Sequence, residues 1–495
     1  MTRNLSYDQR MARRQSISEG HFRSSARRDR DRIRYTRYFR RLSGVTQVAH
    51  SNEDQLYHNR LTHSMKVAQV ASALAKIFLI REDIDPKYLT GNRIGETTHP
   101  DDDSLATSLD PYVVEAAAHA HDLGHPPFGH RGEVVLDNLV EKASDGAAGF
   151  EGNAQSFRII TILSSQNPDW GCNLTRATLN ATLKYPWDRD DPEAQDDDGE
   201  PDKWGYYTDP GTRDEDAFRW ARKPLAGRSK EKVLEAQIMD WADDVTYAVH
   251  DLQDFFRSGL IPLDELFREA IGEVGSEDSR LDEFALSTDE ELGDFKQYLN
   301  AETDVDTSSL DVAKFFRDLL QIFEGDPKSL LTPFSNTDEE QRDLKLFTSM
   351  LVRRYLEAKR SNDPKHVRLE KNGGRYDLKI TPKYEDQVET LKRLTRYYVI
   401  SNPVLMQQQE GQEEILENLF RKLMTEAKDA EGTTFPSSAI PSPYSERVKR
   451  SSTTDTPLYR IVVDLIASLT EKQAISLHKR MHGWAPGSIQ KNLIG

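Results

Sequence analysis

Residues 118–133 read AHAHDLGHPPFGHRGE and place four histidines, one aspartate and one glutamate within sixteen positions. Pro126 and Pro127 interrupt the stretch, so one helix must end before them and another can begin after them. A buried imidazole or carboxylate needs a partner or a metal ion to offset the cost of leaving water. A lone histidine is most often a hydrogen-bonded core residue, but this density of titratable groups predicts an active site.

The composition excludes several classes of protein. Of the 495 residues, 37% are hydrophobic and 30% are charged, which suits a soluble globular protein with one large core or a few smaller ones. No apolar run is long enough to span a membrane, and the N-terminus lacks the apolar segment of a secretory signal, so we expect a cytoplasmic protein. The formal charge of −17 disfavours general coating of nucleic acid. Cys172 is the single cysteine, so a metal site here must use histidine and carboxylate ligands.

Apolar residues recur at helical spacing in segments 62–79, 111–123 and 230–256. Gly124 directly follows the second of these segments, where helices often end. Strand-like alternation is scarce, and residues 375–381 (RYDLKIT) are the best candidate. The sequence therefore predicts a mainly α fold.

Three polar segments are expected at the surface. Residues 23–41 (RSSARRDRDRIRYTRYFRR) look helical, and form either a solvated helix with Arg/Asp pairs or an arm that faces phosphate. Residues 84–111, rich in Asp, Thr and Pro, read as a loop or lid, and the Ser/Thr/Pro-rich residues 430–456 read as a linker or loop.

His121 and Asp122 are adjacent at the end of a predicted helix, so their side chains can grip one ion from neighbouring positions. Two ligands are too few for a tight site. His63 and one aspartate of the pair Asp243 and Asp244 would complete a set of two nitrogen and two oxygen ligands, with positions left open for water and substrate. The sequence does not decide between the two aspartates.

Two further groups of residues could take part in catalysis or substrate binding. His130 and Glu133 have i, i+3 spacing, so the carboxylate can fix the tautomer of the imidazole and create a proton donor or acceptor near neutral pH. Asp243, Tyr247 and Asp251 share one helix face, which offers an ion ligand, an aromatic wall and a hydroxyl acceptor in a line. Core packing plus a surface acid is the alternative for this face, and helix-dipole complementation is the alternative for Glu133.

The ordered pattern of a distant histidine, a His-Asp pair and a later aspartate resembles the HD-domain metal-dependent phosphohydrolases. Longer phrases resemble the deoxyguanosine triphosphate triphosphohydrolases (dGTPases), in order from about residue 28 to residue 256 and again, more faintly, in RIVVDLIASLTEKQAISL. These phrases are RDRDRIRYTRYFRRLSGVTQV, HNRLTHSMKVAQVA, HAHDLGHPPFGHRGE, FEGNAQSFRI and ADDVTYAVHDLQD. An isolated HD dipeptide carries almost no signal, whereas five phrases in order are specific.

The resemblance implies a role for each matching residue. It implies that the metal ligands are His63, His121, Asp122 and Asp243, with Asp244 a neighbour. It implies that the catalytic residues are His130 and its acidic partner Glu133, with His125 near the α-phosphate. It implies that the substrate contacts are Arg60, Lys184, Tyr185 and Lys203 for phosphate, Gln47 for base and sugar, Tyr247 for deoxyribose and Asp251 for its 3′-hydroxyl.

The resemblance also implies an architecture and an activity. It divides the chain into a flexible N-terminal arm (1–27), an HD-type helical core (28–260) and a further C-terminal helical region (261–495). One divalent ion per subunit, Mn²⁺, Mg²⁺ or Fe²⁺, would serve hydrolysis of dGTP or another dNTP to deoxynucleoside and inorganic triphosphate. His130 would protonate the departing 5′-oxygen or activate the water, and the acid role is favoured because an alkoxide leaves poorly.

The resemblance implies homo-oligomers, often hexamers, and single-stranded DNA as an effector for some members. Two other functions remain open: an HD phosphohydrolase acting on nucleoside monophosphates or guanosine polyphosphates, and a nucleotide or nucleic-acid-binding regulator with a degenerate site. The sequence departs from the family pattern at Gly152, where some relatives carry a further histidine, and at Leu465, Ser468 and Leu469.

Overall fold

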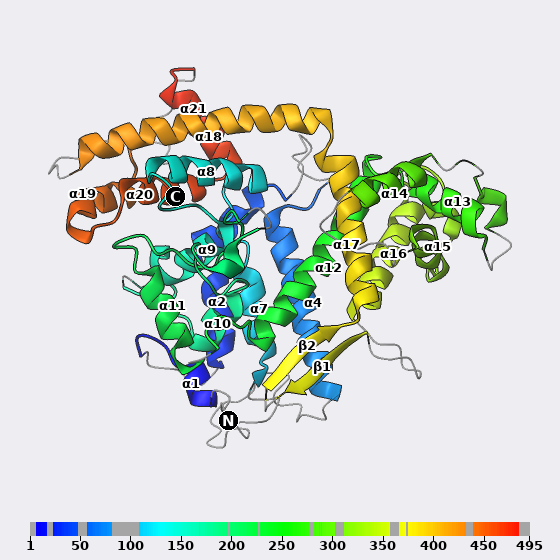
Figure 1. The fold of residues 1–495 in the computed structure, drawn as a ribbon, viewed down its shortest axis with the longest axis horizontal. Coiled ribbons are helices and arrows are strands. Elements are labelled where there is room, and N and C mark those ends of the chain that lie inside the picture. The colour runs from blue at the N-terminus through cyan, green and yellow to red at the C-terminus, as the bar shows by residue number, and fades with distance from the viewer. Residues whose placement is uncertain are drawn as a thin grey trace.

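The computed structural model is built almost entirely of helices, which confirms the prediction of a mainly α fold (Figure 1). It describes residues 6–16, 23–47, 57–81, 108–167, 169–196, 199–225, 228–276, 281–286, 288, 290–301, 311–356, 366–372, 375–431 and 439–484. None of the helices in these ranges is long and apolar enough to cross a bilayer.

The α-helices of the N-terminal half are α1 (Tyr7–Met11), α2 (Ser25–Arg34), α3 (Arg37–Arg41), α4 (Arg60–Arg81), α7 (Pro111–Ala120), α8 (Gly129–Ala143), α9 (Gly152–Arg158), α10 (Arg176–Thr182), α11 (Asp214–Arg222) and α12 (Leu234–Arg257). Those of the C-terminal half are α13 (Leu263–Val274), α14 (Glu291–Ala301), α15 (Val312–Gln321), α16 (Asp338–Leu356), α17 (Pro382–Thr395), α18 (Pro403–Ala430), α19 (Tyr444–Thr454), α20 (Leu458–Ala467) and α21 (Glu471–Met481).

Helices α4, α7 and α12 pack against one another in the centre of the molecule (Figure 1). Their apolar stripes meet in one buried cluster, to which Val67, Val113 and Val245 contribute. The same cluster continues through α13 to α17, as Phe267 and Leu391 show, so a single core crosses residue 260. The three segments with helical periodicity are thus the helices on which the core is built.

Helix α7 shows how the sequence delivers the histidine-rich stretch to this centre. Asp110 caps the helix, because its side chain accepts a hydrogen bond from the backbone N–H of Tyr112 at 2.8 Å. Beyond the helix, a Cβ placed on Gly124 would lie 2.1 Å from the carbonyl oxygen of Gly152. Only glycine permits this approach, so Gly124 lets residues near Gly152 reach the histidines.

The C-terminal helices build a second buried cluster around α8. Helix α18 lies across α8 near the top of Figure 1, with α20 below it and α21 crossing it, and α18 packs against all three. Leu136 of α8 contacts a set of apolar side chains that includes Leu419 and Ile461. The helix that carries His130 therefore rests on residues near the end of the chain.

Residues 375–381, the best strand candidate, do form a strand. β2 (Arg375–Ile380) pairs antiparallel with β1 (Val367–Asn372), with Leu369 opposite Leu378. This hairpin adjoins α12, and it is the only sheet among the described residues.

The expected loops and arm are more ordered than the sequence suggests. In the predicted flexible arm, α1 is anchored because the guanidinium of Arg10 pairs with Glu235 in the interior. In the predicted loop 430–456, residues from Tyr444 to Thr454 form α19, because Tyr444 and Val448 are buried in the second cluster. Most of the predicted loop 84–111 lies outside the described residues.

Candidate active site

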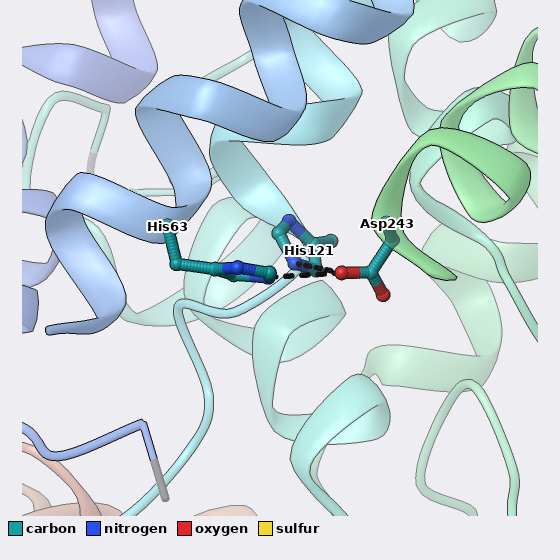
Figure 2. Close-up of side chains that lie close together, drawn as sticks. All are labelled: His63, His121 and Asp243. Carbon is teal, nitrogen blue, oxygen red and sulfur yellow. Dashed lines mark hydrogen bonds and ion pairs between the residues drawn. The ribbon is translucent and has the colours of Figure 1, made fainter. Parts of the chain in front are cut away.

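Three central helices bring two histidines and one aspartate to one point (Figure 2). His63 lies in the first turn of α4, His121 directly follows α7, and Asp243 lies within α12. The Nε2 atoms of His63 and His121 lie 2.9 Å and 3.5 Å from the same Oδ1 atom of Asp243. Residues up to 180 positions apart in sequence thus converge at one carboxylate oxygen.

Asp122 lies on the other side of His121. Its Oδ1 atom lies 3.6 Å from His121 Nε2 and accepts a hydrogen bond from Arg60 Nη1 at 3.0 Å. Its Oδ2 atom is buried and makes no hydrogen bond within the described part of the chain. The neighbouring Asp244 points elsewhere and pairs with Lys392 at 3.2 Å, so the geometry separates the two aspartates that the sequence left equivalent.

These four side chains fit a divalent ion on the chemistry of their donors. Nε2 of His121 and Oδ2 of Asp122 are buried without a hydrogen-bond partner among the described residues, which is costly unless another group completes them. Burial alone would lower the pKa of His121, but the charges of Asp122 and Asp243 raise it to about 9. The cluster therefore favours a positive charge, and imidazoles with carboxylates are donors that a divalent metal ion takes.

Lys184, just after α10, contacts the outer side of this cluster. Its Nζ atom lies 2.8 Å from Asp240 and 3.1 Å from Oδ2 of Asp243. Burial would raise the pKa of Asp243, but the charges of Lys184 and His121 hold it well below its usual range. Because Lys184 contacts Oδ2 of Asp243, the other carboxylate oxygen, Oδ1, faces the two histidines.

The predicted pair of His130 and Glu133 is formed at the start of α8. His130 Nδ1 lies 3.0 Å from Glu133 Oε2, and Glu133 Oε1 accepts a hydrogen bond from the backbone N–H of Gly152 at 2.6 Å. A Cβ on residue 152 would lie 2.7 Å from that same oxygen. The absence of a Cβ at Gly152 therefore lets its backbone N–H approach the Glu133 carboxylate this closely.

His125 stands between the two groups. Its Nδ1 atom lies 3.1 Å from Asp122 Oδ1, and its Nε2 atom lies 3.9 Å from Glu133 Oε2. Burial, followed by the charge of Arg60, lowers its pKa to about 4, so the ring is neutral. Its ring also packs edge-on against that of His130, with centroids 5.2 Å apart.

Lys203 completes the surroundings of Glu133. Its Nζ atom lies 3.7 Å from Glu151, the residue that caps α9. Burial would raise the pKa of Glu133, but Lys203, His125 and the bond from His130 bring it well below its usual range. In return the charge of Glu133 is the largest influence that raises the pKa of Lys203.

The predicted sugar contacts lie next along α12. Tyr247 stands edge-on to His63, and the nearby charge of Asp251 adds to burial in raising the pKa of the Tyr247 hydroxyl well above its usual range. Burial, followed by the charge of Asp254, raises the pKa of Asp251 well above its usual range. Oδ2 of Asp251 is buried without a hydrogen-bond partner among the described residues, so it is available to a further polar group.

The remaining predicted contacts are distributed around the cluster. Arg60 is buried, and its Nε and Nη2 atoms have no acceptor among the described residues. Tyr185 packs against Trp187, and burial raises its pKa to about 12. Gln47 is buried beside Gly129 at the start of α8, with no hydrogen bond to its Oε1 within the described ranges.

Two anchoring residues were not found from the sequence. Glu471, the first residue of α21, accepts hydrogen bonds from the backbone N–H of Thr46 at 2.8 Å and of Phe128 at 3.2 Å. Arg41 is fully buried, and it donates to the carbonyl oxygens of Leu123 at 2.9 Å and His125 at 2.7 Å. No local pattern signals contacts to such distant backbone atoms.

A third unrecognised group joins the N-terminus of α4 to α12. Asp254 Oδ2 accepts hydrogen bonds from the backbone N–H of His58 and from its Nδ1 atom, both at 2.7 Å. The rings of His58 and His250 stack with centroids 4.4 Å apart. The i, i+4 spacing of His250 and Asp254 was the one signal available in the sequence.

Residues 60–248 match the HD domain family, and residues 378–480 match the family described as the Phosphohydrolase-associated domain. A deoxyguanosinetriphosphate triphosphohydrolase-like protein of Streptomyces coelicolor is 32% identical over 481 residues, which cover 93% of each chain. Proteins with the same description from Corynebacterium efficiens and Shewanella sediminis are 30% and 26% identical, over 94% and 99% of this chain and 93% and 98% of theirs. The chain therefore belongs to the HD-domain phosphohydrolases, in the family of deoxyguanosinetriphosphate triphosphohydrolase-like proteins.

Proposed function

We propose that this chain hydrolyses dGTP, or a related deoxynucleoside triphosphate, to the deoxynucleoside and inorganic triphosphate. The observation that supports this most is the juxtaposition of two groups: the buried cluster of His63, His121 and Asp243, and the pair of His130 and Glu133. His125 lies between them, 3.1 Å from Asp122, the residue next to His121, and 3.9 Å from Glu133. The description of the relatives names the same reaction.

His63, His121, Asp122 and Asp243 would hold one divalent ion, Mn²⁺, Mg²⁺ or Fe²⁺. Such an ion supplies a Lewis acid that polarises a phosphate oxygen and makes water a better nucleophile. Asp243 keeps its charge because Lys184 lies beside it, and Asp122 is fixed by Arg60. The protein thus fixes its donors in advance, which lowers the cost of binding the ion.

His130 would move the proton in this reaction. Water attacks the α-phosphorus, the bond from phosphorus to the 5′-oxygen breaks, and the imidazole protonates that oxygen as it leaves. Glu133 holds the ring through Nδ1, which leaves the other ring nitrogen for the substrate. The His130 side chain is 59% exposed, so a nucleotide can reach it.

A triphosphate carries about four negative charges and needs cationic partners. Arg60 has two unused donor atoms beside Asp122 and is suited to bind a phosphate oxygen. Lys184, Tyr185 and Lys203 are the other proposed phosphate contacts. Tyr247 and Asp251 would bind the deoxyribose and its 3′-hydroxyl, and Gln47 would lie near base and sugar.

Product analysis tests the proposal. The protein is incubated with each dNTP and with Mn²⁺ or Mg²⁺, and the phosphorus products are separated. Inorganic triphosphate is expected. Pyrophosphate or orthophosphate would assign the chain to another HD phosphohydrolase reaction, and nucleotide binding without turnover under any ion would make it a regulator.

A substitution separates the two groups in the same assay. His130→Ala is expected to lower kcat by about 100-fold or more, the usual contribution of general acid catalysis. Its ion content should equal that of the wild type, because His130 is not one of the four ligands. Near-normal turnover of this variant would rule out both proton-transfer roles.

Three wider predictions belong to the same proposal. A homo-oligomer, for which the resemblance favours a hexamer, can be measured by sedimentation. A response to single-stranded DNA can be measured by adding an oligonucleotide to the assay. A cytoplasmic location completes the prediction.

A further inference from the structure

The residues of the proton-transfer pair form, with His125, a second group of ligand type. Nitrogen atoms of His125 and His130 and a carboxylate oxygen of Glu133 all lie within 4.8 Å of one another. Glu133 Oε2 lies 3.0 Å from His130 Nδ1 and 3.9 Å from His125 Nε2. Ligands held about 2.1 Å from one tetrahedral zinc ion lie roughly 3.4 Å apart, a value that falls between the observed separations of 3.0 Å and 3.9 Å.

From this geometry we propose that His125, His130 and Glu133 bind a second ion, Zn²⁺, which inhibits the proposed reaction. Two imidazoles and one carboxylate with a fourth position open are a common zinc ligand set. Hard ions such as Mg²⁺ prefer oxygen ligands and gain little from two neutral nitrogens. The site therefore favours zinc over Mg²⁺.

The surroundings prepare these ligands. The N–H of Gly152 holds Oε1 of Glu133 at 2.6 Å, which leaves Oε2 directed at the two rings. His125 and Glu133 are buried and cannot swing away, whereas the His130 side chain is 59% exposed and gives zinc access from solvent. The positive charge of Lys203 already interacts with Glu133, which reduces what the carboxylate can contribute to a bound cation. Most of the affinity for zinc must therefore come from the two imidazole rings.

Zinc would replace the proton between His130 Nδ1 and Glu133 Oε2. An imidazole with zinc on Nδ1 cannot become an imidazolium, so it cannot deliver a proton and regain it near neutral pH. The inhibitory consequence rests on the proposed function, but binding of zinc does not. Binding and inhibition are therefore tested separately.

The binding test counts zinc ions. Metal-free full-length protein is dialysed against Zn²⁺ and analysed for bound zinc. His130→Ala, whose side chain is largely exposed, should bind one zinc ion fewer than the wild type. The matched control His366→Asn, at the start of the hairpin, should bind as many as the wild type. Equal counts for His130→Ala and the wild type would overturn the proposal, as would an equal loss in His366→Asn.

The inhibition test uses the Mn²⁺-loaded wild type with dGTP. Added Zn²⁺ is expected to lower turnover by about 100-fold, the contribution of the blocked proton transfer, while added Mg²⁺ does not. Undiminished turnover with zinc bound would overturn the inhibitory role. If no dNTP is hydrolysed by the Mn²⁺-loaded protein, the proposed function fails, and the zinc counts still decide the site.

Discussion

The two histidine and carboxylate groups of this protein differ in how the chain assembles them. The buried cluster of His63, His121 and Asp243 draws on three helices, and the side chains of its two histidines are 2% and 5% exposed. The second group lies within residues 125–133, and His130 is 59% exposed. One group therefore depends on the packing of the core, whereas the other depends on a local turn and on what supports it.

This difference matches their proposed tasks. Ion ligands must converge from several directions and be shielded from competing water, which a core of packed helices provides. A proton carrier must meet both the substrate and the solvent, which an exposed first turn of a helix provides. Substitutions that affect one group and spare the other test this division.

The largest effect is expected from the ligand in α12. Asp243→Asn should remove the bound ion and lower turnover by about 1,000-fold or more, because a divalent ion supplies several kcal/mol of stabilisation in such reactions. Asp244→Asn is the matched control, since this neighbour pairs with Lys392 and lies outside the cluster. Ion content and kcat measure both variants. Loss of the ion from Asp244→Asn alone would reverse the assignment.

A smaller loss of kcat is expected from a substitution at Gly152, whose backbone N–H holds Glu133. In Gly152→Ala, the new Cβ would lie 2.7 Å from Glu133 Oε1 and push the carboxylate off its backbone donor. Displacements below 1 Å at such a group typically cost about 10-fold to 100-fold in kcat. Ion content should stay normal, because the buried cluster is untouched.

The control for this variant is Gly411→Ala in α18, where an added Cβ meets nothing within 4 Å. Alanine there should leave kcat unchanged and raise stability by about 0.5–1 kcal/mol, because it favours the helix. An ion loss in Gly152→Ala would mean that the two groups are not separable.

A third variant tests the support from the C-terminal helices. Glu471→Gln keeps the size of the side chain but weakens its hydrogen bonds to the backbone N–H groups of Thr46 and Phe128. Charged hydrogen bonds contribute about 1.5–3 kcal/mol, so a lower Tm and a kcat reduced about tenfold are expected. Ion content should not change. A fall in ion content larger than the fall in kcat would contradict local support of α8.

The smallest effect is expected at Cys172, which is buried outside both groups. Burial raises the pKa of its thiol to about 12, so the folded protein at pH 8 should resist a thiol reagent that modifies the unfolded chain. The unfolded thiol ionises near pH 8.5 and the folded one does not. The free energy of unfolding therefore falls as pH rises from about 8.5 toward 12.

Cys172→Ala should lack this fall and keep normal kcat. Equal modification rates for the folded and unfolded protein at pH 8 would contradict the burial. A kcat change in Cys172→Ala as large as that in Gly152→Ala would show that turnover responds to any core substitution.

Sequence reasoning succeeded where the pattern is local. The helical periodicities, the strand at 375–380 and the i, i+3 relation of His130 to Glu133 all follow from neighbouring residues. It left Asp243 and Asp244 equivalent, because only the packing of α12 decides which carboxylate faces the histidines. The ligand roles remain predictions, although the fold brings His63, His121 and Asp243 together and places Asp122 Oδ1 3.6 Å from His121.

Sequence reasoning missed features that depend on burial against residues far away in the chain. The resemblance implied a flexible arm over residues 1–27, and within it the buried pair of Arg10 and Glu235 joins α1 to the interior. Residues 444–454 looked like a loop, but their few apolar side chains find a hydrophobic surface that the sequence does not show. Nothing in the sequence around Arg41 signals that this residue is buried and donates a hydrogen bond to the backbone carbonyl of His125.

The contact of Glu471 with Phe128 joins residues 343 positions apart. The segment that matches the HD domain ends at residue 248. It therefore includes the proposed ion ligands and His130, but not Glu471, which holds the backbone just before α8. The proposed ion ligands and this support of the proposed proton donor therefore lie in segments that match two different family descriptions. A change in the terminal helices can therefore alter the proposed proton transfer while the proposed ion ligands stay unchanged.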